Sequence, residues 1–210
     1  MKTYSVNDIV SKVRVKLDEI AANESEMNGL EADNVNMDTV IKSCIADAYR
    51  LVTMLADASL LEGVHSSSAS LTIDEKLVGR VVLPSDFLRC LYVRLSSWSS
   101  ACSEFISEDS PEYRMQSNKW ACGTPSIPVA ALVHNGSGRV IELYKAASAN
   151  DTLSSFIYIP IWSESSDKVK VSDQTADAFI YFVAALTLTT FREDLANDMF
   201  KVARGLIGLE

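Results

Sequence analysis

The sequence predicts an α+β protein in which helices from the two ends of the chain form a bundle and a mostly antiparallel β-domain is inserted between them. Two observations support this prediction. Apolar residues recur at helical spacing near both ends of the chain, and between them the period of the apolar pattern falls to two. We therefore expect a helical bundle from residues 1–65 and 170–210 and a β-rich insert domain from residues 66–169.

Two helices are expected before the insert. Ser5 and Asp8 are spaced as in a capping box, and the apolar residues after them share one helical face, which predicts a helix over residues 6–23. A broader apolar stripe predicts a second helix over residues 37–57. Its members are Val40, Ile41, Cys44, Ile45, Ala48, Leu51, Val52 and Leu55. The polar, acidic residues 23–36 predict a loop between the two helices.

Strands are expected after a linker of small residues at positions 66–70. The alternating pattern predicts strands over residues 80–83, 91–95 and 156–162, the last of them interrupted by Pro160. Helical spacing returns at the C-terminal end, where it predicts one helix from Ala176 to Leu186 and another from Leu195 to Ile207.

A β-hairpin is expected over residues 129–144. Its two strands, 129–134 and 139–144, flank the sequence Asn135-Gly136-Ser137-Gly138. Asparagine and glycine tolerate the positive φ that a tight hairpin turn requires. We expect the turn to be exposed, which makes Asn135 and Gly136 candidate docking residues.

Composition and charge exclude several classes of protein. The net charge of −9 argues against general binding to a phosphate backbone. No apolar run approaches the roughly 20 residues that a membrane span needs, and the first residues lack the apolar segment of a signal peptide, so we expect synthesis in a cytoplasm. The four cysteines are widely spaced and include no C-x-x-C pair, so we expect them to be buried free thiols.

No pattern in the sequence amounts to a catalytic or metal-binding constellation. His65 and His134 are isolated from each other and are expected in exposed loops. The paired carboxylates lie near expected helix ends, where acids in a first turn complement the helix dipole. They are Glu24 with Glu26, Glu108 with Asp109, and Glu193 with Asp194. We therefore expect no enzymatic activity, no cofactor and no metal.

Residues 98–125 form a long irregular segment that carries large side chains in a polar background. Within it, Ser110 and Pro111 predict a short helix running toward Ser117. Large side chains in loops often anchor protein partners. The candidate interface residues are Trp98, Phe105, Tyr113, Met115 and Trp120. An equally open alternative is that these side chains fold back as a satellite core under the loop.

Four segments resemble the head–tail adaptor, or connector ring, proteins of tailed bacteriophages. They are Val82-Leu83-Pro84-Ser85-Asp86-Phe87-Leu88-Arg89, Val93-Arg94-Leu95-Ser96-Ser97-Trp98, Glu108-Asp109-Ser110-Pro111-Glu112-Tyr113-Arg114 and Gly123-Thr124-Pro125-Ser126-Ile127-Pro128. A Leu-Pro-x-Asp-Phe turn that feeds a strand, with amphipathic helices at both ends, is similar to the tail tubular protein A type of short-tailed phages and to ring proteins of crAss-like phages.

The resemblance implies a structural virion protein at the head–tail junction. It would form a homo-oligomeric ring of about twelve copies beneath the portal protein and contact neighbouring tail or ring proteins. DNA would pass through the channel without specific binding, which suits an acidic wall. Two alternatives stay open. One is another neck or tail-completion protein, and the other is a small enzyme or ligand-binding domain with a pocket between the β-insert and the bundle.

Overall fold

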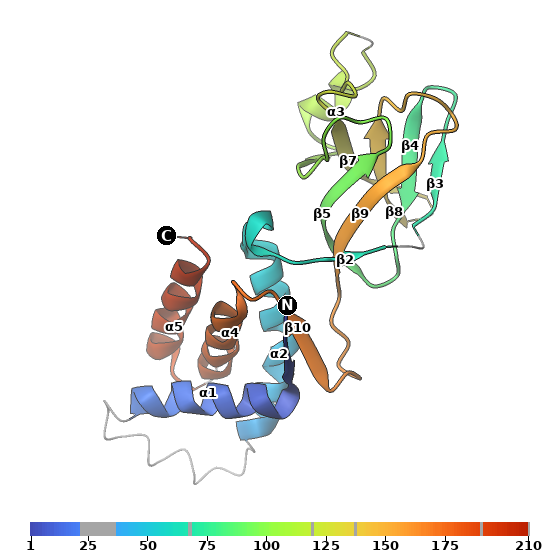
Figure 1. Ribbon diagram of the computed structural model, residues 1–210. Coiled ribbons are helices and arrows are strands. Elements are labelled where there is room, and N and C mark those ends of the chain that lie inside the picture. The colour runs from blue at the N-terminus through green and yellow to red at the C-terminus, as the bar shows by residue number, and fades with distance from the viewer. Residues whose placement is uncertain (22–36, 67–68, 119, 137, 190, 210) are drawn as a thin grey trace. The chain divides into compact units, whose positions relative to one another are not determined.

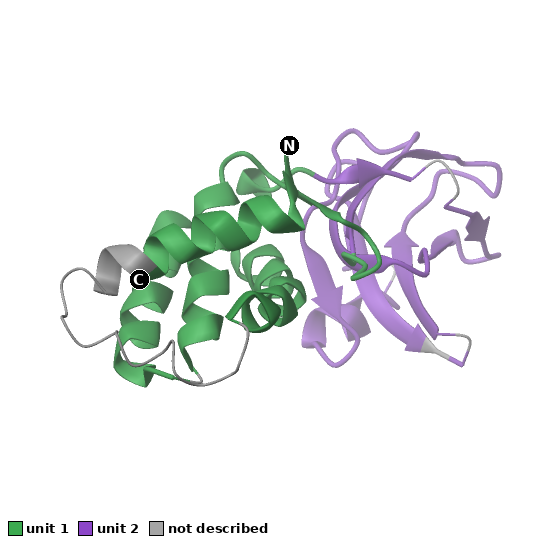
Figure 2. Cartoon of the chain, turned by 90° about the horizontal axis from the view of Figure 1, so that it is seen from below, with its two compact units in different colours: residues 1–62, 161–210 green, residues 63–160 purple. Residues whose placement is uncertain are grey.

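The computed structural model describes the chain except for residues 22–36, 67–68, 119, 137, 190 and 210, so the loop expected over 23–36 lies outside the described residues. Over the described residues the protein is α+β, with five α-helices and sheets in which all but one of the strand pairs are antiparallel (Figure 1). The chain divides into two compact units (Figure 2). Unit 1 comprises residues 1–62 and 161–210, and unit 2 comprises residues 63–160, against expected insert boundaries of 66 and 169.

Four helices pack together in unit 1. They are α1 (Val6–Ala21), α2 (Met37–Leu55), α4 (Ala176–Thr189) and α5 (Glu193–Leu206). Helix α4 contacts each of the other three. Its side chains are buried on nearly every side, including Phe179, Phe182 and Val183. A helix that is apolar all round belongs in a core, which explains why this stretch is the most apolar of the chain.

The two N-terminal helices follow the predicted patterns closely. Helix α1 begins at the predicted capping box, because the Ser5 N–H donates to Asp8 Oδ2 over 3.0 Å and the Asp8 N–H donates to Ser5 Oγ over 3.1 Å. The buried face of α2 differs from the predicted apolar stripe at its end. Leu55, a predicted member, is exposed, whereas Tyr49 and Ala56, which were not predicted, are buried.

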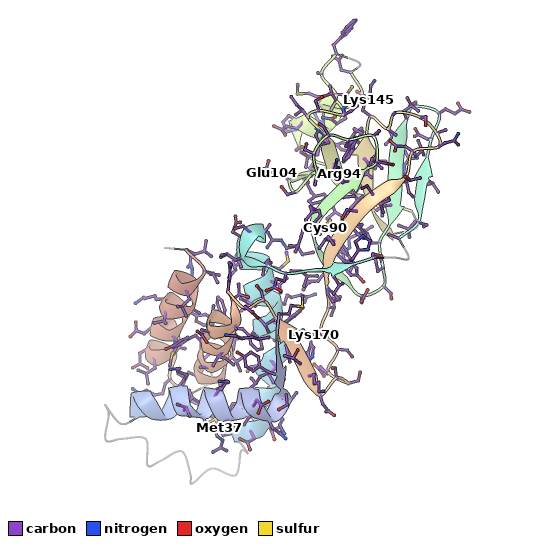
Figure 3. All side chains as sticks on the ribbon, viewed as in Figure 1. Met37, Cys90, Arg94, Glu104, Lys145 and Lys170 are labelled. Atoms are coloured by element: carbon purple, nitrogen blue, oxygen red, sulfur yellow. The ribbon has the colours of Figure 1, made fainter. Side chains whose placement is uncertain are left out.

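Unit 1 also contains a two-stranded antiparallel sheet that the sequence did not predict. Strand β1 (Lys2–Ser5) pairs with β10 (Lys168–Val171), with Lys2 opposite Val171 and Ser5 opposite Lys168. Strand β10 alternates buried valines with exposed lysines, one of which, Lys170, is labelled in Figure 3. This sheet joins the first residues of the chain to the segment that precedes the two C-terminal helices.

Unit 2 contains two sheets. The three-stranded sheet has the order β2 (Val64–His65), β9 (Leu153–Pro160), β5 (Phe87–Leu95). The five-stranded sheet has the order β3 (Leu71–Ile73), β4 (Val78–Val82), β8 (Gly138–Tyr144), β7 (Val129–Asn135), β6 (Phe105–Ser107). Strand β6 runs parallel to β7 and is followed by the short helix α3 (Pro111–Met115), which begins at Pro111 as predicted.

Several local predictions are confirmed or corrected in unit 2. The hairpin is present, with Asn135 opposite Gly138, whose φ of 123° requires glycine. The strand expected over 156–162 ends at Pro160, so Ile161 and Trp162 lie outside it. His65 and His134 are exposed, as expected, but they lie in strands β2 and β7 rather than in loops.

The five-stranded sheet carries an apolar cluster on each face. Its inner face packs against the three-stranded sheet around the main core of unit 2, to which Val81, Ile141 and Leu143 contribute alongside Phe156 from β9. Its outer face carries a smaller cluster, Ala131, Val133, Val140 and Tyr144, against which Ile106 and Tyr113 pack. The segment that follows β6 therefore covers the second face of this sheet.

Candidate functional site

The segment expected to carry an interface, residues 98–125, has a base that is tied to the sheets of unit 2. Val93 and Cys102 exchange backbone hydrogen bonds of 2.9 and 2.8 Å. The Ser99 N–H donates to the Pro125 carbonyl over 2.9 Å. These bonds bring the two ends of the segment together, so its conformation is fixed at the base.

Three of the predicted interface residues instead pack against the sheets of unit 2 and hold the segment in place. Trp98 is only 1% exposed, belongs to the main core and donates from Nε1 to the Lys145 carbonyl over 3.3 Å. Phe105 is half-buried against the same core. Trp98 is therefore corrected from a candidate interface residue to a core residue, because a side chain with so little exposed surface offers nothing to a partner.

Tyr113 anchors helix α3 to the outer face of the sheet. The helix is capped by Ser110, whose hydroxyl accepts from the Tyr113 N–H over 3.2 Å. The Tyr113 ring meets the Tyr144 ring edge-on, with 6.4 Å between centroids. For Trp98, Phe105 and Tyr113, the alternative of a folded-back satellite core describes the structure better than the interface hypothesis.

Residues 115–127 form the outer part of the segment, called the outer loop here (Figure 1). Its large apolar side chains are exposed. Met115 is 50% exposed and Trp120 is 90% exposed, and both were candidate interface residues. Ile127 is 75% exposed and was not singled out from the sequence. Large side chains exposed in a loop often anchor protein partners, which makes these three the candidate contacts of the outer loop.

Hydrogen bonds within the outer loop fix its shape. The Gly123 N–H donates to Gln116 Oε1 over 2.9 Å, and the Trp120 N–H donates to Asn118 Oδ1 over 3.0 Å. Gly123 also approaches β7 closely, since a Cβ atom there would lie 3.0 Å from the Val129 side chain. A loop ordered in this way loses less conformational freedom on binding a partner.

The hairpin tip is the other candidate docking element. Gly136 is exposed, and a Cβ atom added there would meet no heavy atom within 4 Å. Asn135 is the last residue of β7 and pairs with Gly138 across the turn. Position 136 therefore has room for a larger side chain.

An open cavity of about 870 Å³ lies in unit 2, between helix α3 and the outer face of strands β4 and β8. Four basic side chains and three carboxylates line it, namely Lys76, Arg80, Arg114, Lys145, Asp74, Glu75 and Glu142. Tyr113, Tyr144 and Cys122 also contribute to its wall. This cavity could not be predicted from the sequence, because its residues come from four separate segments and alternate with core residues.

Glu142 forms the centre of the polar network in this cavity. The residue is only 8% exposed. Its carboxylate accepts hydrogen bonds from Arg80 Nε over 3.0 Å and from the Tyr144 hydroxyl over 2.8 Å. The Tyr113 hydroxyl donates to the same carboxylate over 3.2 Å. Burial, and then the neighbouring carboxylate, raise the pKa of both tyrosines above the ordinary value. These phenols therefore stay protonated and act as donors.

Within the described residues, no group of three or more His, Cys, Asp and Glu side chains is arranged to hold a metal ion. None of the helices described is long and apolar enough to cross a membrane. Models of known protein families give no match to this chain, and neither do curated protein sequences.

Proposed function

We propose that this chain is a structural virion subunit that forms a ring beneath the portal of a tailed bacteriophage, connects capsid to tail and continues the DNA channel. Trp120 is the observation that carries the proposal, because a tryptophan 90% exposed on an internally hydrogen-bonded loop is typical of a protein contact. The resemblance in the motifs of residues 82–128 supports the same class of protein.

The way the helices pack supports a role as a ring subunit. In the proposed arrangement, the helices from both ends of the chain form a bundle centred on α4, and the β-rich unit carries the outer loop toward a neighbour. Two exposed apolar sites, Trp120 and Ile127, would then bury their surface against the next copy or an adjacent ring. The acidic net charge suits a channel wall along which DNA slides.

The test is co-expression of the tagged chain with the portal and neck genes of the same genome, followed by purification and electron microscopy. We expect a ring of this chain on the portal. The variant Trp120→Ala should reduce the recovered complex, whereas Val82→Ala, which removes an exposed apolar side chain from β4, should not. Recovery of the chain alone under all conditions would contradict the proposal.

A further inference from the structure

The cavity beside α3 is lined by more cationic than anionic side chains, although the chain as a whole is acidic. Its lining carries four cationic and three anionic side chains, whereas the whole chain has a net charge of −9. The charge of Arg80 is already neutralised by two ion pairs. Its Nε lies 3.0 Å from Glu142 Oε1, and its Nη2 lies 3.4 Å from Asp74 Oδ2. The remaining charges are three cations and the carboxylate of Glu75, so cations are in excess and can attract an anionic ligand.

These three cations are Lys76, Arg114 and Lys145, and they come from three different parts of unit 2. Lys76 lies in the turn between β3 and β4, Arg114 in α3 and Lys145 directly after β8. Among the residues that the structure describes, none of the three forms an ion pair with a carboxylate. Figure 3 shows Lys145 at the end of unit 2 where α3 lies.

The backbone has an unusual conformation at Lys145 and at Leu77, the residue after Lys76. Leu77, next to Lys76, has a φ of 61°, and Lys145 has a φ of 69°, both in the left-handed region that residues other than glycine rarely adopt. Asp74 Oδ1 accepts from the Lys76 N–H over 2.9 Å, and the Ala146 N–H donates to the Leu77 carbonyl over 3.0 Å. Strained backbone that is fixed at the rim of a cavity points to a function for the side chains it positions.

We propose that this cavity binds an acidic peptide segment of a protein partner, with carboxylates of the segment paired to Lys76, Arg114 and Lys145. The inference rests on the proposed function, which supplies the protein partners. A peptide fits better than a nucleic acid because the cavity offers three separate cations on an acidic chain, and not the long basic face that tracks a phosphate backbone. Exposed Met115, beside Arg114, extends the surface with apolar contact that suits a protein.

The test is fluorescence anisotropy with a labelled peptide of twelve residues that alternates glutamate with glycine, using the full chain at low salt. The variant Lys76→Gln, Arg114→Gln, Lys145→Asn removes the three charges. Asparagine is used at position 145 because it tolerates the left-handed backbone. We expect binding to weaken about tenfold, because each of the three exposed charge pairs contributes only modestly.

The matched control is the variant Lys2→Gln, Lys168→Gln, Lys170→Gln. It removes the same charge from exposed positions on β1 and β10 in unit 1. We expect it to bind the peptide within about twofold of the unmodified chain. Equal weakening by both variants, or no binding by the unmodified chain, would overturn the proposal.

Two further arms separate this inference from its alternatives. A glutamine–glycine peptide should not bind, and a single-stranded DNA of twelve nucleotides should bind less tightly than the acidic peptide. Tighter binding of the DNA would overturn the proposal in favour of a nucleic-acid site. Because the assay needs no ring, peptide binding without assembly on the portal would contradict the proposed function alone, and assembly without peptide binding would contradict the cavity alone.

Discussion

Tyr113 donates a hydrogen bond of 3.2 Å to the buried carboxylate of Glu142, and this bond ties the short helix α3 to strand β8. A helix of five residues has little stability of its own, so tertiary contacts must hold it in place. The outer loop begins where α3 ends. The position of Trp120 therefore depends on the contacts of a tyrosine seven residues earlier in the chain.

Removing this hydrogen bond should weaken unit 2. We predict that Tyr113→Phe lowers the free energy of unfolding by about 1 kcal/mol, because the carboxylate loses one of three donors while Arg80 and Tyr144 stay in place. Urea denaturation measures the change. Tyr92→Phe, at an exposed position on β5, is the control and should change the value by less than about 0.3 kcal/mol. Equal effects of the two substitutions would show that the bond contributes nothing.

The two tryptophans of the predicted interface segment should respond in opposite ways to truncation. We predict that Trp98→Ala costs about 3–5 kcal/mol of folding free energy, since it leaves a large cavity in the main core. Trp120→Ala should change folding by no more than about 0.5 kcal/mol and instead impair assembly. Thermal unfolding distinguishes the two variants. A large loss of stability in Trp120→Ala would place that side chain in the core.

Stability at low pH should depend on Asp151. Burial acts to raise the pKa of Asp151, but hydrogen bonds donated by Ser97, the Ala147 N–H and Ser96 outweigh it, and the resulting pKa lies below the ordinary value. A lowered pKa stabilises the folded state above about pH 4, the pKa in the unfolded chain, and this contribution is lost as the pH falls through the folded-state pKa.

We predict that the free energy of unfolding of the unmodified chain falls more steeply below about pH 4 than that of Asp151→Asn. Denaturation with urea at a series of pH values measures the two slopes. Asp109→Asn, at an exposed position before α3, is the control and should keep the slope of the unmodified chain. Parallel curves for the unmodified chain and Asp151→Asn would contradict the prediction.

The four cysteines should differ in reactivity. Cys90 and Cys102 are buried, and burial raises the pKa of both thiols, so that little of the reactive thiolate forms. Cys44 and Cys122 are only half-buried, which corrects the expectation that all four are buried. We predict that a thiol reagent at about pH 8 labels Cys44 and Cys122 before the other two. Mass spectrometry of partly labelled protein gives the order, and equal rates at all four would contradict it.

Elements with a long apolar pattern, or with clear capping or turn residues at their ends, could be predicted from the sequence. The first helix follows from the capping box of Ser5 and Asp8, and the hairpin follows from Asn135 and its neighbouring glycines. Strands β1 and β10 were missed because four residues are too few to establish a period of two, and because each strand is defined only by a partner far away in the chain.

The candidate site was predictable only in part. Aromatic residues in a polar loop marked the right segment, but side-chain type does not tell a buried tryptophan such as Trp98 from an exposed one such as Trp120. The difference comes from the backbone bridge between Val93 and Cys102, which brings Trp98 under the sheet. The cavity was missed for a related reason, since Lys76 and Lys145 are adjacent only once β4 and β8 pair.

Closing a ring should depend on salt and on a partner. About twelve copies of a chain with a net charge of −9 would gather roughly 108 negative charges around one axis. The Debye length falls from about 30 Å at 0.01 M salt to about 8 Å at 0.15 M, so repulsion between copies weakens as salt rises. Apolar burial at the contacts is less sensitive to salt, and a portal would add contact area to every copy.

Native mass spectrometry across a salt series, with and without the portal protein, shows whether this chain forms a ring on the portal. We predict a monomer of 23.0 kDa when the chain is alone and a ring of about twelve copies when the portal is present, with the ring favoured at higher salt. Stable free rings at low salt, or a monomer that never binds the portal, would contradict the account.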